Sequence, residues 1–469
     1  MNLKLKEIIK ITNAELIIGN ENETCENFSY DTRTIQKGDI YIGFKGEKID
    51  GSIYWKDALD KGAKAVIVGE IELLQDDIKK YQEQGKSIVK VKDTIKAFGE
   101  IASYKRDLYN IPVVGVTGSV GKTSTKDIIA SVLSQKFNTL KTEGNNNNHI
   151  GLPLTLLRLK NEEVAVVEMG MNHLGEISYL SKITKPNIAV ITNIGTSHIG
   201  NLGSRENILK AKLEILDGME EKKIIINNDN DLLHKWYEEN KDKYSIITYG
   251  IHNESDIMAK NIKENEEGST FIFLINEEEI EIQVPVGGEH FIYNAMCAAA
   301  VGKVLNIENE EIIQGIKKFE LTKKRMEIIE LKNNITLIND TYNASYESIT
   351  ASLKYMTTLN KKRKIAVLGD VLELGEFSKE LHEKIGEEVV KNKIDMLICT
   401  GENAKFIVEK VKEKGMPCEN IYYEENNEKI ILRIEKEMKQ EDVILVKASK
   451  AMKFYNIAGE LTKKYSVRK

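Results

Sequence analysis

The sequence predicts an α/β protein of three domains, with a mostly parallel sheet in the central one. Three observations lead to this prediction. The chain has 469 residues, about three times the common domain length of roughly 150 residues. From about residue 112, apolar strand-like runs alternate with amphipathic helical patterns, which favours a parallel sheet with helices on its faces. The alternation is interrupted at 254–286 and restarts near residue 335.

The first part, residues 1–108, is predicted to be a smaller α/β domain. Its strand-like runs, Asp39–Phe44 and Ala65–Val68, are short and mixed with helical patterns. The N-terminus lacks the long apolar core of a signal peptide. No run approaches the roughly 18 apolar residues of a membrane span, and the four cysteines show no CxxC spacing. We therefore expect a cytoplasmic protein without membrane insertion, disulfides or a zinc site.

The central part, residues 109–319, is predicted to hold the parallel sheet. Its strands are expected at Pro112–Thr117, Val164–Val167 and Asn187–Thr192, with helices after the first strand, near 174–183 and near 204–216. Two further runs, Phe271–Ile275 and Ile280–Val284, flank an acidic turn and predict antiparallel strands. A helix rich in alanine follows at 291–304.

The last part, residues 320–469, is predicted to be a second, Rossmann-like α/β domain. Four apolar runs, each followed by a helical pattern, support this prediction: Ile335–Ile338, Ile365–Leu368, Met396–Cys399 and Val443–Val446. The domain boundaries are therefore expected near residues 109 and 320.

The overall charge argues against one large class of function. A net charge of −6 is not that of a strongly basic nucleic-acid binder. Hydrophobic residues make up 41% and charged residues 30%, which is typical of a globular protein rather than a disordered one. Only eight of the 67 basic residues are arginine, so the positions of Arg33 and Arg325 are informative.

The strongest local signal is the run Thr117–Thr123, Thr-Gly-Ser-Val-Gly-Lys-Thr, between a buried strand and a helix. Backbone N–H groups in such a loop, together with the helix N-terminus, bind phosphate oxygens. Lys122 can reach the terminal phosphates of a nucleotide, and the Thr123 hydroxyl can bind Mg²⁺. The spacing departs from GxxxxGK[ST], because Val116 stands where the first glycine is usual. The motif therefore predicts nucleoside triphosphate binding without specifying the reaction.

Two side chains are expected beside this loop. Glu168 ends one predicted strand and His198 follows the next one, and the carboxyl ends of parallel strands meet at one edge of a sheet. A carboxylate at that edge can bind Mg²⁺. By periodicity alone, Lys210 and Lys212 are solvated lysines of a surface helix.

These residues together resemble the ATP-dependent Mur ligases of peptidoglycan synthesis. The shared motifs are Thr117–Thr123, Val166–Gly170, Thr192–Gly200 and Lys210–Ile215. The closer likeness is to the branch that adds D-alanyl-D-alanine to UDP-N-acetylmuramoyl-tripeptide, and three segments carry it: Thr142–Thr155, Asn339–Ser348, and Gly369–Ser378 followed by His382. The resemblance spans about Asp31 to Lys450. It implies a UDP-binding domain, an ATP-binding domain and a C-terminal domain that closes over the site.

The resemblance also implies roles for individual residues. Lys122, Glu168, His198 and Lys212 correspond to the catalytic residues of the family. The positions implied for ATP are Gly118, Ser119, Val120, Gly121, Lys122, Thr123, Ser124, Asn294, Arg325 and Asp340. Two Mg²⁺ ions would be held by Thr123, Glu168, His198 and Lys212, the last as a carbamate formed with CO₂. A carbamate turns a cation into an anion that suits a metal site, which reverses the reading of Lys212 as a solvated lysine.

The same resemblance implies positions for the two other substrates. For the nucleotide sugar, the N-terminal positions are Asp31, Thr32, Arg33, Lys45 and Gly46. The remaining substrate positions are Asn145, Asn148, Asn343, Lys447 and Ser449. Three departures from the family pattern affect this region: Lys450 replaces a usual arginine, Ala448 replaces a common glycine, and Ser345-Tyr346 replaces the frequent Asn-Pro. Lysine lacks the planar two-pronged donor of arginine.

The predicted reaction is an ADP-forming ligation through an acyl phosphate, in the cytoplasmic supply of cell-wall precursor for cell shape and division. The partners would be UDP-N-acetylmuramoyl-tripeptide and D-alanyl-D-alanine, without nucleic acid, and the protein is expected to be a monomer. The nearest alternative is the related ligase that adds a diamino acid to the dipeptide nucleotide. Folylpolyglutamate and cyanophycin synthetases share the loop but not the N-terminal segment. A nucleotide switch or transport ATPase would need a partner-binding or membrane segment, which nothing in the sequence marks. A non-catalytic scaffold is disfavoured because the proposed ATP and metal residues are all present.

Overall fold

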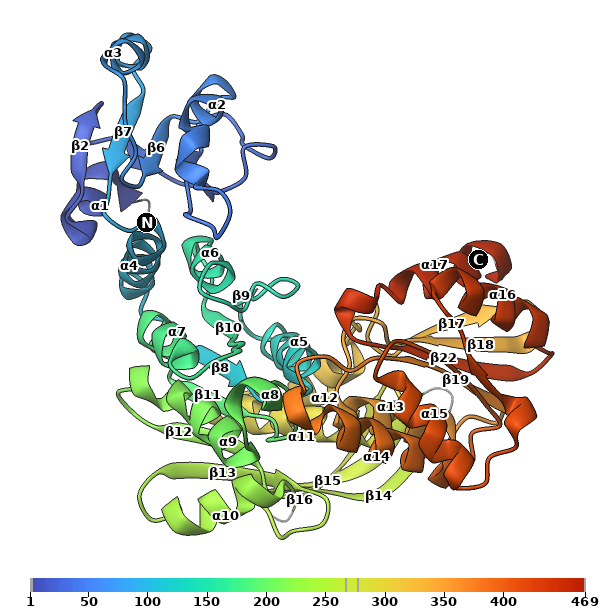
Figure 1. Cartoon of the computed structure of the whole chain (residues 1–469). Coiled ribbons are helices and arrows are strands. Elements are labelled where there is room, and N and C mark those ends of the chain that lie inside the picture. Colours follow the sequence, from blue (N-terminus) through green and yellow to red (C-terminus); the bar gives the residue numbers. More distant parts are fainter. Residues whose placement is uncertain (1–2, 266–267, 276–277, 468–469) are drawn as a thin grey trace.

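The computed structural model describes residues 3–265, 268–275 and 278–467. In these ranges the strands form one two-stranded sheet and three larger sheets, which follow one another along the chain. The N-terminal sheet, in blue, lies at one end of the molecule, and the central and C-terminal parts lie side by side (Figure 1). The predicted α/β class is confirmed. No helix of the described chain is long and apolar enough to cross a membrane.

The N-terminal sheet has the order β2-β7-β6-β5-β4, with only β2 antiparallel to its neighbour. Its strands are β2 (Glu15–Ile18), β4 (Phe28–Ser29), β5 (Ile40–Ile42), β6 (Ala65–Val68) and β7 (Ser87–Lys90), and β1 (Leu3–Lys4) pairs with β3 (Thr24–Cys25). Its helices are α1 (Leu5–Thr12), α2 (Trp55–Asp60), α3 (Gln75–Glu83) and α4 (Thr94–Asp107). The strand expected at Asp39–Phe44 is shorter because the Asp39 carboxylate accepts the amide hydrogen of Gln36 and closes a turn.

The central sheet has the order β16-β15-β14-β13-β12-β11-β8-β10-β9. Its parallel strands are β8 (Val113–Thr117), β9 (Thr139–Lys141), β10 (Val164–Glu168), β11 (Ile188–Ile191), β12 (Lys223–Asn227), β13 (Ser245–Gly250) and β14 (Ile257–Asn265). The last two strands, β15 (Gly268–Ile275) and β16 (Glu278–Val284), run antiparallel, as predicted. Residues 276 and 277 of the acidic turn lie outside the described residues.

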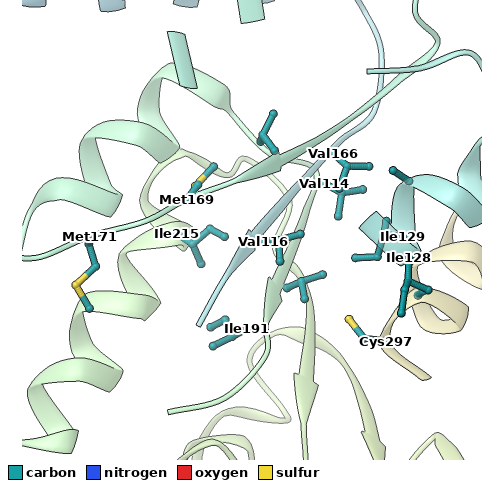
Figure 2. Close-up of a cluster of buried hydrophobic side chains, with 14 of the residues drawn as sticks. Val114, Val116, Ile128, Ile129, Val166, Met169, Met171, Ile191, Ile215 and Cys297 are labelled. Atoms are coloured by element: carbon teal, nitrogen blue, oxygen red, sulfur yellow. The ribbon is translucent and has the colours of Figure 1, made fainter. Parts of the chain in front are cut away.

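The helices of the central part cover both faces of this sheet (Figure 1). They are α5 (Lys122–Leu133), α6 (Gly151–Leu157), α7 (Glu176–Thr184), α8 (Ile199–Leu202), α9 (Arg205–Leu213), α10 (Asp231–Asn240), α11 (Glu289–Val304) and α12 (Asn309–Lys317). The core between them is apolar, as Figure 2 shows around Val116 and Ile129. All five residues of β8 are buried, which is the expected burial for a central parallel strand covered on two faces.

The C-terminal sheet has the order β17-β18-β22-β19-β20-β21. Its strands are β17 (Glu327–Leu331), β18 (Ile335–Asn339), β19 (Arg363–Gly369), β20 (Met396–Thr400), β21 (Ile421–Tyr423) and β22 (Asp442–Lys447). The helices are α13 (Tyr346–Met356), α14 (Ser378–Lys391), α15 (Ala404–Glu413), α16 (Asn427–Glu437) and α17 (Tyr455–Tyr465). Strands β17 and β21 of this sheet, and strands β9, β12, β13 and β14 of the central sheet, were not predicted from the sequence. β17 is an antiparallel edge strand that carries two glutamates, Glu327 and Glu330, and β21 has only three residues.

The order of the central strands positions the site. β8 lies between β10 and β11, and all three are parallel. Their carboxyl ends therefore meet, and the chain leaves β8 toward α5 at this edge. Such an edge is where open α/β sheets bind ligands.

Candidate active site between the central and C-terminal sheets

A cavity of about 470 Å³ opens between the central sheet edge and the C-terminal part. The phosphate loop, the segment after β10 and the loop after β11 line it from the central side. Segments at the carboxyl ends of β18 and β22 line it from the other side. The two α/β parts together therefore enclose one candidate active site.

The phosphate loop begins at the end of β8 and continues into α5. Gly118 has a φ of 144°, and a Cβ atom there would stand 2.0 Å from Thr192 Oγ1, so only glycine fits. Gly121 also has a positive φ, 84°. The Lys122 ammonium donates to the carbonyl oxygens of Gly118 (2.8 Å) and Ser119 (3.2 Å), and burial lowers the pKa of Lys122. The loop thus places a cation and a helix N-terminus at the cavity.

Glu168 stands beside this loop as expected. Thr123 Oγ1 donates to one oxygen of the Glu168 carboxylate (2.8 Å), and Asn147 Nδ2 donates to the other (2.6 Å). Glu168 is only 2% exposed, yet it lines the cavity. A carboxylate and a hydroxyl facing one cavity fit Mg²⁺, which takes a few protein oxygens and completes its shell with phosphates and water.

His198 reaches the same cavity from the loop after β11. It has a φ of 64° and precedes α8. Its Nδ1 lies 2.6 Å from the Glu373 carboxylate of the C-terminal part. The imidazole lowers the pKa of Glu373. His198 therefore connects the two halves of the site.

Lys212 is buried within α9, with 1% of its surface exposed. Burial lowers its pKa well below the ordinary value. In the described part of the chain, no carboxylate lies within salt-bridge distance of it. The interpretation from periodicity is therefore wrong for Lys212, while Lys210 is exposed as expected. The pattern of the helix face alone did not reveal that this lysine is buried.

The remaining nucleotide positions divide between the two halves. Asn294, on α11, accepts a hydrogen bond from Thr125 (2.9 Å), and its buried Nδ2 has no partner among the described residues. Asp340 follows β18 and accepts from Ser352 (2.8 Å) and from Lys447 (2.5 Å). An amide donor without a partner at a cavity wall fits recognition of a base or a phosphate.

The substrate positions are not all brought together. Asn145, Asn148, Asn343 and Lys447 line the cavity, and Ser449 lines an adjoining one of about 560 Å³ with Asn343, Lys450 and Lys453. The Ser345 hydroxyl accepts the amide hydrogen of Ser348 and caps α13, so the altered turn keeps a helix cap.

The N-terminal candidates form a separate group. Asp31, Thr32, Arg33, Lys45 and Gly46 lie in the loops that follow β4 and β5 of the N-terminal part, and they line neither cavity. Arg33 Nη2 lies 2.6 Å from the Asp31 carboxylate, which lowers the pKa of Asp31 to about 2. The Arg33 side chain is 84% exposed. This pair thus presents a guanidinium to solvent at the far end of the molecule.

Several residues at the site were not predicted as site residues. Asn147 holds Glu168, Glu373 stands against His198, and Glu347 accepts from the backbone of Thr196 (2.6 Å). The sequence did contain signals for these three residues. Asn147 lies inside the Asn145–Asn148 run, and the two glutamates lie in the motifs Asn339–Ser348 and Gly369–Ser378. Only their partners across the fold distinguish them from surface residues.

The first turn of α8 is expected to control how the two halves dock, because Gly200 lies there. A Cβ atom on Gly200 would stand 2.5 Å from Gly375 N and 2.7 Å from Glu373 O, both backbone atoms. Gly200→Ala should therefore separate the halves and lower turnover about tenfold or more, because near-attack geometry tolerates little displacement. Gly459→Ala, where a Cβ atom meets nothing within 4 Å, is the matched control. Proteolysis near residue 320 should also be faster in Gly200→Ala than in the control. Equal turnover and equal proteolysis rates for the two variants would contradict this assignment.

Comparisons with known proteins agree with this architecture. Residues 24–106 match the model described as Mur ligase family, catalytic domain, residues 116–302 the Mur ligase middle domain, and residues 324–450 the Mur ligase, glutamate ligase domain. A UDP-N-acetylmuramoyl-tripeptide–D-alanyl-D-alanine ligase of Bacillus subtilis is 35% identical, over 94% of each chain. The enzyme of that name from Escherichia coli K12 is 34% identical over 87% of this chain and 88% of its own.

Solved structures give the same answer. A crystal structure of MurF from Acinetobacter baumannii superposes with a TM-score of 0.88, at 27% identity and over 99% of each chain. MurF ligase from Thermotoga maritima in complex with ADP gives a TM-score of 0.81, at 28% identity, over 94% of this chain and 97% of that one. With three domain models matched in order and relatives above 30% identity along nearly its whole length, this chain belongs to the Mur ligase family.

Proposed function

We propose that the chain joins D-alanyl-D-alanine to UDP-N-acetylmuramoyl-tripeptide at the expense of ATP, with release of ADP and phosphate. The observation that carries the proposal is the single cavity shared by the phosphate loop, Glu168 and the carboxyl end of the C-terminal sheet. Relatives that bear this name cover nearly the whole chain. The product would serve cell-wall synthesis, and therefore cell shape and division, in the cytoplasm, where ATP and nucleotide sugars are available.

The chemistry requires activation of a carboxylate. A carboxylate is a poor electrophile, so its oxygen attacks the γ-phosphorus of ATP, and the bond from that phosphorus to ADP breaks. The amine of the dipeptide then attacks the acyl carbon, the amide forms, and phosphate leaves with the electron pair of the broken bond. Lys122 and the loop N–H groups would stabilise the charge that develops on the phosphoryl group.

The metal and the modified lysine are proposed together. Thr123 and Glu168 would hold one Mg²⁺, and His198 with Lys212 would serve a second. Bound Mg²⁺ would offset the negative charge where the ATP phosphates and the substrate carboxylate meet. The pKa of Lys212 is lowered by burial, so its amine is neutral enough to add to CO₂. Loss of one proton then leaves a carbamate anion. A buried Lys212 ammonium could not supply the negative charge that this anion offers to a metal ion.

The three larger sheets support a proposal in which each part of the chain binds a different substrate. Residues 1–108 would bind the nucleotide sugar through Asp31, Thr32, Arg33, Lys45 and Gly46. Residues 109–319 would bind ATP, with Asn294 on the adenine side. Residues 320–469 would bind the dipeptide near Asn343 and Ser449 and close over the site, which excludes water from the acyl phosphate.

The amine dependence of phosphate release tests the proposal. Purified protein with ATP, Mg²⁺ and the tripeptide nucleotide should release phosphate only after D-alanyl-D-alanine is added. The assay is run with the lysine and the meso-diaminopimelate forms of the tripeptide. Equal stimulation by a diamino acid with the dipeptide nucleotide would assign the chain to the related diamino-acid ligase. Phosphate release that needs no amine would point to a nucleotide switch.

A further inference from the structure

The backbone around Arg325 is held in an unusual conformation. Lys324 and Met326, its two neighbours, have φ angles of 66° and 49°. Residues other than glycine rarely adopt this left-handed backbone conformation. Such conformations persist where the surrounding structure fixes them, and they are common at functional sites. Here the Lys324 carbonyl accepts the amide hydrogen of Tyr342 (3.0 Å), and the Met326 amide donates to Asp340 Oδ1 (3.2 Å).

These two hydrogen bonds fasten both sides of Arg325 to the segment that follows β18. The side chain then lies over the ring of Tyr342, with Cζ 4.0 Å from the ring centroid. Both residues line the cavity. In the described ranges, no carboxylate lies within ion-pair distance of the guanidinium, and its buried Nε has no hydrogen-bond partner.

The charges near this ring suit an anionic ligand. The Lys450 ammonium lies 5.6 Å from the same ring, and Lys122 and Lys447 line the same cavity. Burial lowers the pKa of both of these lysines, and the positive charge of Arg325 contributes to each lowering. Four carboxylates, Glu168, Glu176, Asp340 and Glu347, also line the cavity, and Asp340 pairs with Lys447. Within the described residues, Arg325, Lys122 and Lys450 form no salt bridge, so these three cations fit an anionic ligand.

An aromatic partner differs from an acidic one in its effect on arginine. A carboxylate would neutralise the guanidinium and take up its N–H donors in a two-pronged salt bridge. A ring face attracts the cation through its quadrupole and leaves the donors along the edge of the guanidinium plane available. Contact with the ring of Tyr342 therefore orients Arg325, and the guanidinium donors that do not interact with the Tyr342 hydroxyl stay available to bind phosphate.

We propose that Tyr342 is a positioning residue for catalysis, whose ring holds the Arg325 guanidinium toward the nucleotide phosphates. The inference rests on the proposed function, since it assigns ATP as the anion. It also bears on Lys450, whose ammonium lies near the same ring but lacks the planar donors of a guanidinium. With only a lysine at that position, Arg325 is the planar cation on this ring, and its orientation depends on Tyr342.

Three variants test the assignment. Tyr342→Leu should lower kcat/KM for ATP about tenfold, the order of a desolvated cation–π contact, while KM for D-alanyl-D-alanine stays within about twofold. Tyr342→Phe keeps the ring and should retain kcat/KM within about threefold. Tyr422→Leu is the matched control. The Cζ atom of Arg433 lies 4.2 Å from the Tyr422 ring centroid in the same C-terminal part, but neither residue lines either of the two cavities.

A double-mutant cycle with Arg325→Ala supplies the second measurement. The effect of Tyr342→Leu on kcat/KM should nearly vanish in the Arg325→Ala background, because the ring then has no guanidinium to orient. Additive effects, or equal losses in Tyr342→Phe and Tyr342→Leu, would overturn the assignment. Wild-type protein without amine-dependent phosphate release would instead overturn the proposed function, so the two failures are distinguishable. Calorimetric titration with ADP in the presence of Mg²⁺ shows whether each variant still binds nucleotide.

Discussion

Replacing Lys212 by alanine is expected to abolish ligase activity, with a loss on the order of 1000-fold in kcat, the upper range for removal of one electrostatic group from an active site. The physical reason is the buried position of the amine, whose lowered pKa permits carbamate formation. The alanine variant would lack the proposed carbamate and would leave space for a small anion. Added formate or acetate should therefore restore part of the activity in a phosphate-release assay.

The helix that carries Lys212 also provides the control. Lys210 lies two residues earlier on α9 and is exposed, so Lys210→Ala should leave kcat unchanged within about twofold, as for most surface substitutions. Full activity of Lys212→Ala, without any response to short carboxylates, would remove the carbamate from the proposed mechanism. Mass spectrometry under CO₂ gives an independent readout.

Glu168→Ala is expected to remove Mg²⁺-dependent turnover, with a loss of about 100-fold or more in kcat. The carboxylate accepts hydrogen bonds from Thr123 and Asn147 in a buried setting. Alanine would leave these two donors without their acceptor, at about 1–3 kcal/mol each, so the melting temperature must be measured beside the activity.

Glu168→Gln separates the two effects. The amide keeps the volume and one acceptor oxygen, so most of the stability should remain while the negative charge is lost. Glu163→Gln, at an exposed position just before β10, controls for the loss of one surface charge. If Glu168→Gln keeps wild-type turnover and the same Mg²⁺ dependence, Glu168 does not belong to the metal site.

Much of the central part follows from the sequence because its signals are local. The phosphate loop is specified without reference to distant residues. Its signals are the five buried residues of β8, two glycines with positive φ and the Lys122-Thr123 pair. Parallel alternation then implies that Glu168 and His198 arrive at one sheet edge, and the structure places both on the cavity wall. The antiparallel strands β15 and β16 were recognisable because an acidic turn separates them.

Other features could not be read from the chain. β17 shows no apolar–polar alternation, because two adjacent isoleucines stand between its two glutamates, and at the sheet edge one of these isoleucines, Ile328, is exposed. Lys212 looks like its neighbour Lys210, since α9 is short and its pattern does not show what packs on each face. His198 contacts Glu373, 175 positions along the chain, and Arg325 contacts Tyr342, 17 positions along the chain. No local sequence pattern encodes contacts over such separations.

The sequence by itself therefore determined the α/β class, the phosphate loop and the resemblance to the Mur ligases, because backbone conformation and strand burial are encoded by neighbouring residues. Only the tertiary structure decided which charges are buried, which partners they have and which of them share a cavity. The reason is physical: the pKa of Lys212, the hydrogen bonds of Glu168 and the orientation of Arg325 depend on desolvation and on contacts between distant segments, and these exist only when the sheets are assembled.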